Sequence, residues 1–211
     1  MNYGIKAQQL FENIQVAPDI EGIYRRMGFN KKLTQLTAKD AEKINNKIEQ
    51  GLSYCHNKGV FGRFEINEKD FDFVKINNDL IFKSKGIAKL LAASDEIVLM
   101  AATSGAEVAK KIFDEVQNGD ITFGVILDAV ASQNTDAILD WMMGFLNKVL
   151  TREGKRLTKH RYSPGYGDLN LEYQKVIYQL LNLERLDLKL TEKYMLVPEK
   201  SVIALAGIER I

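Results

Sequence analysis

The chain has 211 residues, of which 45% are hydrophobic and 27% charged. This composition is typical of globular proteins and excludes a disordered or collagen-like chain. Its 29 basic and 28 acidic residues nearly balance, so no overall field attracts nucleic acid or an anionic membrane surface. The single cysteine, Cys55, excludes an internal disulfide and a zinc site built from several thiolates.

A single domain over residues 1–211 is expected, because one hydrophobic core serves chains of up to roughly 250 residues. Residues 1–15 contain Lys6 and Glu12 and lack the apolar run of a secretion signal. No apolar stretch approaches the roughly 20 residues that span a bilayer. We therefore expect a cytoplasmic protein without a membrane segment.

The first elements along the chain are predicted to be helices. Apolar residues at helical spacing follow Asp19 and end before Gly28, and Thr37 can cap a second helix that runs toward Cys55. Residues 1–58 are therefore expected to form a helical N-terminal part. Alternating apolar residues over 60–66 then indicate a strand, and shorter runs near 71–74 and 80–82 complete a small antiparallel meander.

The rest of the chain alternates between strands and helices. Ser84 can cap a short helix, residues 96–102 are apolar enough for a fully buried strand, and a helix is predicted over 106–116. A long helix over 121–151 is predicted to be the core scaffold. A further helix over 171–181 precedes strands near 195–197 and 201–206.

Several familiar functional signatures are missing from the sequence. Thr103-Ser104-Gly105 lies between a strand and a helix, but without the spaced glycines of a phosphate loop it reads as a helix cap. A corrinoid-binding Asp-x-His-x-x-Gly motif would need an aspartate where Tyr54 stands. The sequence contains no nucleophile elbow and no paired-histidine zinc motif. We predict no catalytic residue and no metal site.

One segment, residues 161–168, carries side chains suited to ligand binding. Arg161 can hold a carboxylate through two charge-assisted hydrogen bonds. Gly165 and Gly167 allow a ligand to lie against the main chain, and Tyr166 offers a ring face to a cation or an adenine. The alternative is a tight turn in which Asp168 caps a helix that starts near residue 169.

At these residues the sequence resembles a known family, because Arg-x-x-x-Gly-Tyr is similar to the S-adenosylmethionine-binding signature of the reactivation domain of cobalamin-dependent methionine synthase. Pro164 fits the same signature. A second block resembles the family's carboxy-terminal pattern in order and spacing. It comprises Leu190, Thr191, Glu192, Pro198, Ser201 and Val202.

The resemblance implies a fold, a ligand and a function. The expected fold is a C-shaped α+β domain, a mainly antiparallel sheet with flanking helices that include one long helix, here as a stand-alone short form. The expected function is that of an accessory protein for the reductive methylation of cob(II)alamin, with S-adenosylmethionine as methyl donor and cobalamin carried by a partner chain. The implied ligand-binding residues are Arg161, Pro164, Gly165, Tyr166, Gly167 and Glu192.

The expected partner is a corrinoid-binding methionine synthase or a related methyltransferase. The basic residues Lys155, Arg156, Lys159 and Arg161 could receive a flavodoxin-like electron donor, and the alternative is a solvated basic loop. No nucleic acid and no membrane is expected as a partner.

The sequence also departs from the family pattern. Gly167 and Asp168 follow the Gly-Tyr pair where the family has Pro-Ala-Cys-Pro, and Ala206 stands where the family has an aromatic residue. Two other functions therefore stay open: a non-catalytic corrinoid-protein docking module that has lost S-adenosylmethionine binding, and an S-adenosylmethionine sensor.

Overall fold

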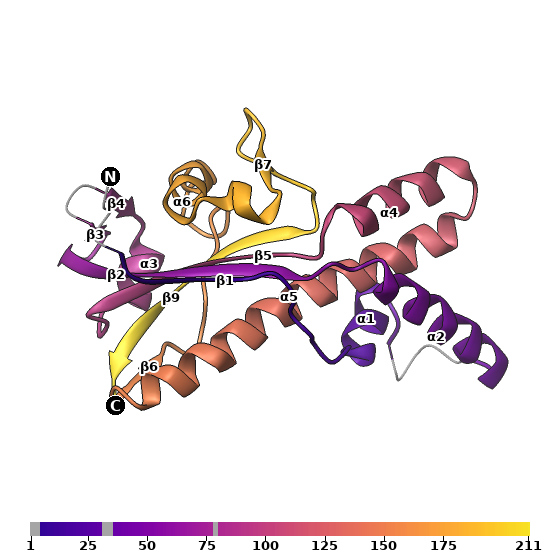
Figure 1. Cartoon of the computed structure of the whole chain (residues 1–211), viewed down its shortest axis with the longest axis horizontal. Helices are drawn as coiled ribbons and strands as arrows, with labels where there is room; N and C mark the ends of the chain where they lie inside the picture. The colour runs from indigo at the N-terminus through magenta and orange to yellow at the C-terminus, as the bar shows by residue number, and fades with distance from the viewer. Residues whose placement is uncertain (1–4, 31–35, 78–79) are drawn as a thin grey trace.

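A computed structural model describes residues 5–30, 36–77 and 80–211. Its main element is a seven-stranded sheet in which every described pairing is antiparallel, with the order β4-β3-β2-β5-β9-β6 and with β1 also paired to β2 (Figure 1). The strands are β1 (Ile5–Phe11), β2 (Lys58–Lys69), β3 (Phe73–Ile76), β4 (Leu80–Lys83), β5 (Glu96–Thr103), β6 (Lys155–Leu157) and β9 (Ser201–Arg210). A separate hairpin consists of β7 (Lys189–Leu190) and β8 (Leu196–Val197).

The long strand β2 joins two parts of the sheet. Its residues 59–64 lie between β1 and β5, and its residues 66–69 pair with β3. The register shifts at the point where β3 begins to pair, between Ile66 and Glu68. The predicted meander is thus confirmed, and it continues into the central sheet through a single strand.

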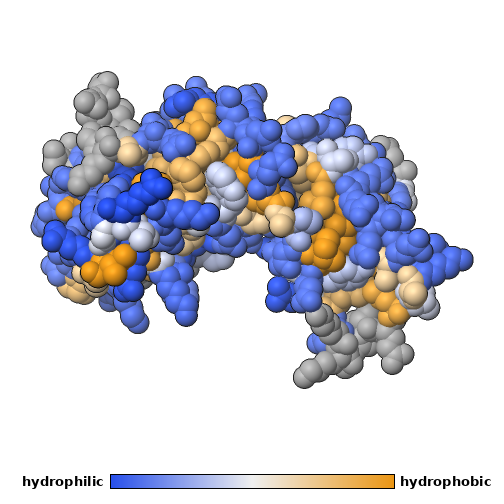
Figure 2. Space-filling model, turned by 60° about the horizontal axis from the view of Figure 1, so that its bottom comes forward, coloured by the Kyte–Doolittle hydropathy of each residue, from blue (hydrophilic) through white to orange (hydrophobic). Residues whose placement is uncertain are grey.

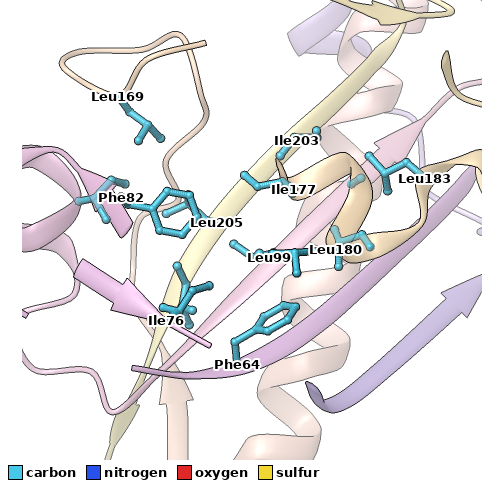
Figure 3. Packing of buried hydrophobic residues seen from close by; sticks show 14 of the residues in the cluster. Phe64, Ile76, Phe82, Leu99, Leu169, Ile177, Leu180, Leu183, Ile203 and Leu205 are labelled. Atoms are coloured by element: carbon cyan, nitrogen blue, oxygen red, sulfur yellow. The ribbon is translucent and has the colours of Figure 1, made fainter. Parts of the chain in front are cut away.

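Both faces of the central strands are covered. All eight residues of β5 are buried, and they alternate between two hydrophobic clusters. Leu99 and its neighbours on one face pack under α3 (Lys85–Leu90), α6 (Tyr173–Leu181) and the 3-10 helix η1 (Leu183–Leu186), as Figure 3 shows for ten labelled side chains. Met100 and its neighbours on the other face pack against the long helix α5 (Ile121–Thr151).

Helix α5 has the bounds that the sequence predicts, and it runs along the length of the molecule (Figure 1). Its middle and C-terminal turns cover the sheet, while its N-terminal turns pack with α1 (Ile20–Arg26), α2 (Ala38–Ser53) and α4 (Ala106–Asn118) in a third cluster. Over the ranges that the structure describes, we find no helix with the length and apolarity needed to cross a bilayer.

Two strands of the seven-stranded sheet were not expected from the sequence. Residues 1–58 were predicted to be helical, yet β1 lies within them and pairs with β2. Its polar Gln8 hides the strand pattern, and the Gln8 side-chain amide donates to the Leu181 carbonyl at 3.0 Å. Strand β6 was missed because its first residues, Lys155 and Arg156, are charged, and both form ion pairs. Polar residues that have specific partners in the fold thus obscure the alternating hydrophobic pattern by which edge strands are recognised in a sequence.

The predicted cap at Thr103-Ser104-Gly105 is wrong in detail. Helix α4 begins after Gly105, and no side chain caps it. The Ser104 hydroxyl is buried and lies 2.7 Å from the Thr135 hydroxyl on α5. The Ser104 side chain therefore links β5 to α5.

Asp168 also has a different role from the predicted one, because it lies at the start of α3 and not at a helix beginning near residue 169. Its carboxylate accepts hydrogen bonds from the Ser84 hydroxyl and the Lys85 amide, both at 2.6 Å. Ser84 is the N-cap of α3, as predicted. The hydrogen bond from Ser84, with those from the Lys85 and Gly86 amides, holds the pKa of Asp168 below its ordinary value.

Buried charges fasten β2, β5 and β6 together. Glu96 is 2% exposed and accepts from Arg63 Nη2 at 3.0 Å and Lys155 Nζ at 2.6 Å. Arg63 also donates to Glu153, at the end of α5, at 2.8 Å. This hydrogen bond raises the pKa of Arg63 and lowers that of Glu153. Both shifts favour the charged forms of Arg63 and Glu153.

We predict that Glu96→Gln lowers the free energy of unfolding by about 3 kcal/mol, because it removes the buried carboxylate that Arg63 and Lys155 share and leaves them only the more exposed Glu153. The matched control is Asp95→Asn, since the neighbouring Asp95 is 62% exposed in its pair with Arg210. That change costs less than about 1 kcal/mol. Urea unfolding of the two variants measures the difference, and equal losses would contradict the structural role of the cluster.

We predict that Ser84→Ala destabilises the fold by about 1 kcal/mol, the usual cost of a lost N-cap.

We predict that Asp168→Asn destabilises the fold in a pH-dependent manner. Because folding lowers the pKa of Asp168, the stability from its charge is present above about pH 3.9, the ordinary value for Asp, and is lost as the pH falls through the lowered pKa. Thermal unfolding of wild type and Asp168→Asn should therefore differ at pH 7 and converge in acid.

Candidate functional site

The segment after β6 continues along the edge of β9. The Thr158 amide donates to Gly207 O at 2.9 Å, and Tyr162 and Leu205 exchange backbone hydrogen bonds at 2.9 and 2.8 Å. Neighbouring side chains of an extended segment point to opposite faces. Tyr162 therefore packs in the cluster under α6, and Arg161 turns toward α5.

Arg161 lies among acidic side chains of α5. Its guanidinium donates to Asp140 and lies 3.4 Å from Asp136 Oδ1 and 3.8 Å from Met143 Sδ. Asp136 also pairs with Arg26 of α1. Two arginines from distant parts of the sequence thus meet at two carboxylates one helical turn apart.

An open cleft of about 470 Å³ adjoins Arg161. Its lining includes Asp140, Met143, Lys159 and Gly144, and a Cβ built on Gly144 would meet nothing within 4 Å. The volume falls within the roughly 300–1,000 Å³ of small-molecule sites.

Figure 2 shows the outline of the molecule indented between the end that carries β6 and the end that carries α1 and α2, in agreement with the expected C shape.

The charges in and beside this cleft suit a ligand with both signs of charge: Arg161 and Asp140 line the cleft, and Asp136 lies next to it through its contact with Arg161. The Arg161 side chain is 26% exposed, while those of Asp136 and Asp140 are 40% and 68% exposed. A guanidinium binds a carboxylate through paired hydrogen bonds, and carboxylates bind an ammonium. The arrangement can therefore hold the α-carboxylate and α-ammonium of an amino-acid group.

The turn that follows Arg161 is held by its own contacts. Pro164 is buried, and the Gly165 amide donates to Leu169 O at 2.8 Å. Gly165 and Gly167 have φ of +91° and +55°, and a Cβ on Gly167 would overlap the Tyr162 hydroxyl. The turn itself thus requires both glycines. The Tyr166 ring is 71% exposed, so it is accessible to a ligand or partner.

Other predicted residues lie elsewhere. Glu192 is exposed in the turn of the β7–β8 hairpin, on the α6 side of the sheet, whereas Arg161 contacts α5 on the opposite side (Figure 1). Of the basic segment, Lys155, Arg156 and Arg161 have acidic partners. Most of that segment is therefore neutralised within the fold.

Three site residues were missed at the level of sequence: Asp136, Asp140 and Gly144. They share a spacing of four, which places them on one flank of α5. This spacing marks a flank of the helix, but nothing in the sequence signals that Arg161 reaches it.

A second, larger cleft of about 760 Å³ lies where the ends of β1, β5 and η1 meet the start of α4. A hydrogen bond between His56 and Glu107 and an ion pair between Lys58 and Asp187 border it, each at 2.6 Å. Cys55 also lines it, and burial raises the pKa of the Cys55 thiol to about 12, so the thiol stays protonated at neutral pH. The described part of the chain contains no group of three or more His, Cys, Asp or Glu residues that could hold a metal ion.

Comparison with known proteins finds a similar solved structure but no match by sequence. Neither profiles of known protein families nor curated proteins match the sequence. A solved structure of the MetH reactivation domain bound to AdoHcy is similar, with a TM-score of 0.71 and 17% sequence identity over 95% of this chain and 78% of that one. The chain therefore has the fold of the MetH reactivation domain, as its resemblance over residues 161–202 led us to expect.

Proposed function

We propose that this protein binds S-adenosylmethionine in the cleft beside Arg161 and serves the reductive methylation of cob(II)alamin held by another chain, a corrinoid-dependent methionine synthase or a related methyltransferase. The observation that carries the proposal is the cluster of Arg161, Asp136 and Asp140 at an open cleft. The fold supports it, since the similar MetH reactivation domain is bound to AdoHcy.

The cluster supplies a reason for ligand selection. Arg161 is paired with the two aspartates. A zwitterionic amino-acid group can insert between them, with its carboxylate on Arg161 and its ammonium on Asp136 or Asp140, so that every charge keeps an opposite partner. The nearby carboxylates also favour a sulfonium cation over a neutral thioether.

The turn that carries Pro164, Gly165, Tyr166 and Gly167 begins three positions after Arg161, and none of these residues lines the cleft. Their contact with the adenosyl part of the ligand remains a prediction from the family resemblance. The exposed ring of Tyr166 is available for stacking. Glu192 remains a prediction from the family resemblance, because its position on the opposite side of the sheet adds no support.

The bound S-adenosylmethionine supplies an electrophilic methyl group. An electron from a donor such as a flavodoxin-like protein reduces cob(II)alamin to cob(I)alamin, which takes the methyl group and leaves S-adenosylhomocysteine. Methyl transfer drives the unfavourable reduction forward. The residues of this chain hold the methyl donor and orient it toward the partner, a positioning role that needs no general acid or base.

We predict that Arg161→Ala weakens S-adenosylmethionine binding about 10- to 100-fold, the cost of a lost charge-assisted hydrogen-bonded pair. Gly144→Leu should block the cleft without disturbing the fold, because open space surrounds the Cβ position. Calorimetry measures both effects. Arg210→Ala is the matched control, since Arg210 is exposed in a pair with Asp95.

A wild-type protein that binds no S-adenosylmethionine would contradict this assignment and leave the docking-module function. Retained binding by both Arg161→Ala and Gly144→Leu would place the ligand elsewhere in the chain.

We also predict that the protein, with a reductant and S-adenosylmethionine, restores methylcobalamin to a methionine synthase that lacks its own reactivation domain. The absorbance of the corrinoid reports the change, and Arg161→Ala should slow it about as much as it weakens binding. Binding without any restoration, tested with several corrinoid methyltransferases, would favour the sensor function instead.

A further inference from the structure

An exposed apolar face on α4 and α5 lies away from both clefts. It consists of Phe113 and Val116 of α4 and Ile121 and Val125 of α5, with exposed fractions of 64%, 47%, 63% and 49%. Soluble monomers rarely leave large hydrophobic side chains exposed next to one another. This α4–α5 face is therefore a candidate for an interface.

Contacts place Val116 against α5 and show which side of α4 carries Phe113 and Val116. A Cβ on Gly124 would lie 2.8 Å from Val116 Cγ2, so Val116 sits against α5 beside Val125. Lys111 lies over the Tyr54 ring at the end of α2, 5.9 Å from its centroid. Lys111 thus marks the side of α4 that faces α2, and Phe113 and Val116 face the other way, since they lie two and five positions further along the helix.

The charged residues of α4 are arranged so that two copies of this helix can pair with each other. Lys110 and Asp114 lie one helical turn apart on one flank, next to Phe113. When two copies of α4 pack antiparallel about a two-fold axis near Ile112, Lys110 of each copy faces Asp114 of the other. The same arrangement brings the two Phe113 rings together and places Val116 near Ala109 of the second copy. A two-fold interface needs this kind of self-complementarity.

We propose that the exposed apolar face of α4 and α5 is the interface of a homodimer, in which the α4 helices pack antiparallel and Lys110 of one copy pairs with Asp114 of the other. This interface leaves the Arg161 cleft accessible, because Arg161 contacts α5 at residues 136–143, beyond the turns that carry Ile121 and Val125. The dimer does not depend on the proposed function.

Sedimentation velocity over a range of concentrations tests the proposal on the full chain. The wild type is expected to form a species of twice the 23.9 kDa of one chain. Phe113→Asp should raise the dissociation constant of the dimer about tenfold or more, because a charge would replace the central apolar contact. Phe71→Asp is the matched control: Phe71 is 71% exposed, follows β2 at the far end of the sheet, and should leave the dimer intact.

A charge exchange provides a second test that does not rely on a hydrophobic substitution. Lys110→Glu should weaken the dimer by placing two carboxylates opposite each other, and the double variant Lys110→Glu with Asp114→Lys should restore it. A wild type that stays monomeric, a dimer unaffected by Phe113→Asp, or a failure of the double variant to recover association would each overturn the proposal. Circular dichroism checks that each variant is folded.

Discussion

The structure depends on the burial of both faces of β5. This strand has eight buried residues and lies between β2 and β9 in the centre of the sheet, so neither face can meet water. One face requires the long helix α5, and the other requires α3, α6 and η1. The only carboxylate of the strand, Glu96, is tolerated because two cations reach it. The remaining strands extend from this centre.

The same constraint positions the candidate site. Since α5 must follow the sheet, one flank of its middle turns is left beside the segment that continues along β9. Strand alternation in that segment sends Tyr162 into the core and Arg161 toward α5. The cleft therefore arises where the covering helix meets the edge of the sheet, and its charged residues come from elements that the core holds in place.

Sequence reasoning predicted the elements that have a simple hydrophobic period. The buried strand β5, the capped helices α2 and α3 and the full length of α5 all have such a pattern. Strands β1 and β6 were missed because polar residues there have partners far along the chain, such as Leu181 for Gln8 and Glu96 for Lys155. Arg161 could be singled out from the family resemblance. Its acidic partners could not, since nothing local in residues 136–140 signals which distant arginine will reach them.

Asp136 has a consequence for the mechanics of the molecule. This carboxylate contacts Arg26 in α1 and Arg161 beside β9, so it couples two segments that lie 135 positions apart in sequence. If Arg161 turned to an incoming carboxylate, Asp136 would still hold Arg26, and Arg26 is held independently by Gln133 at 2.7 Å. Helix α1 therefore keeps its position whether or not Arg161 is paired with the aspartates. Charge pairs in the cleft can break and re-form without moving the N-terminal helix.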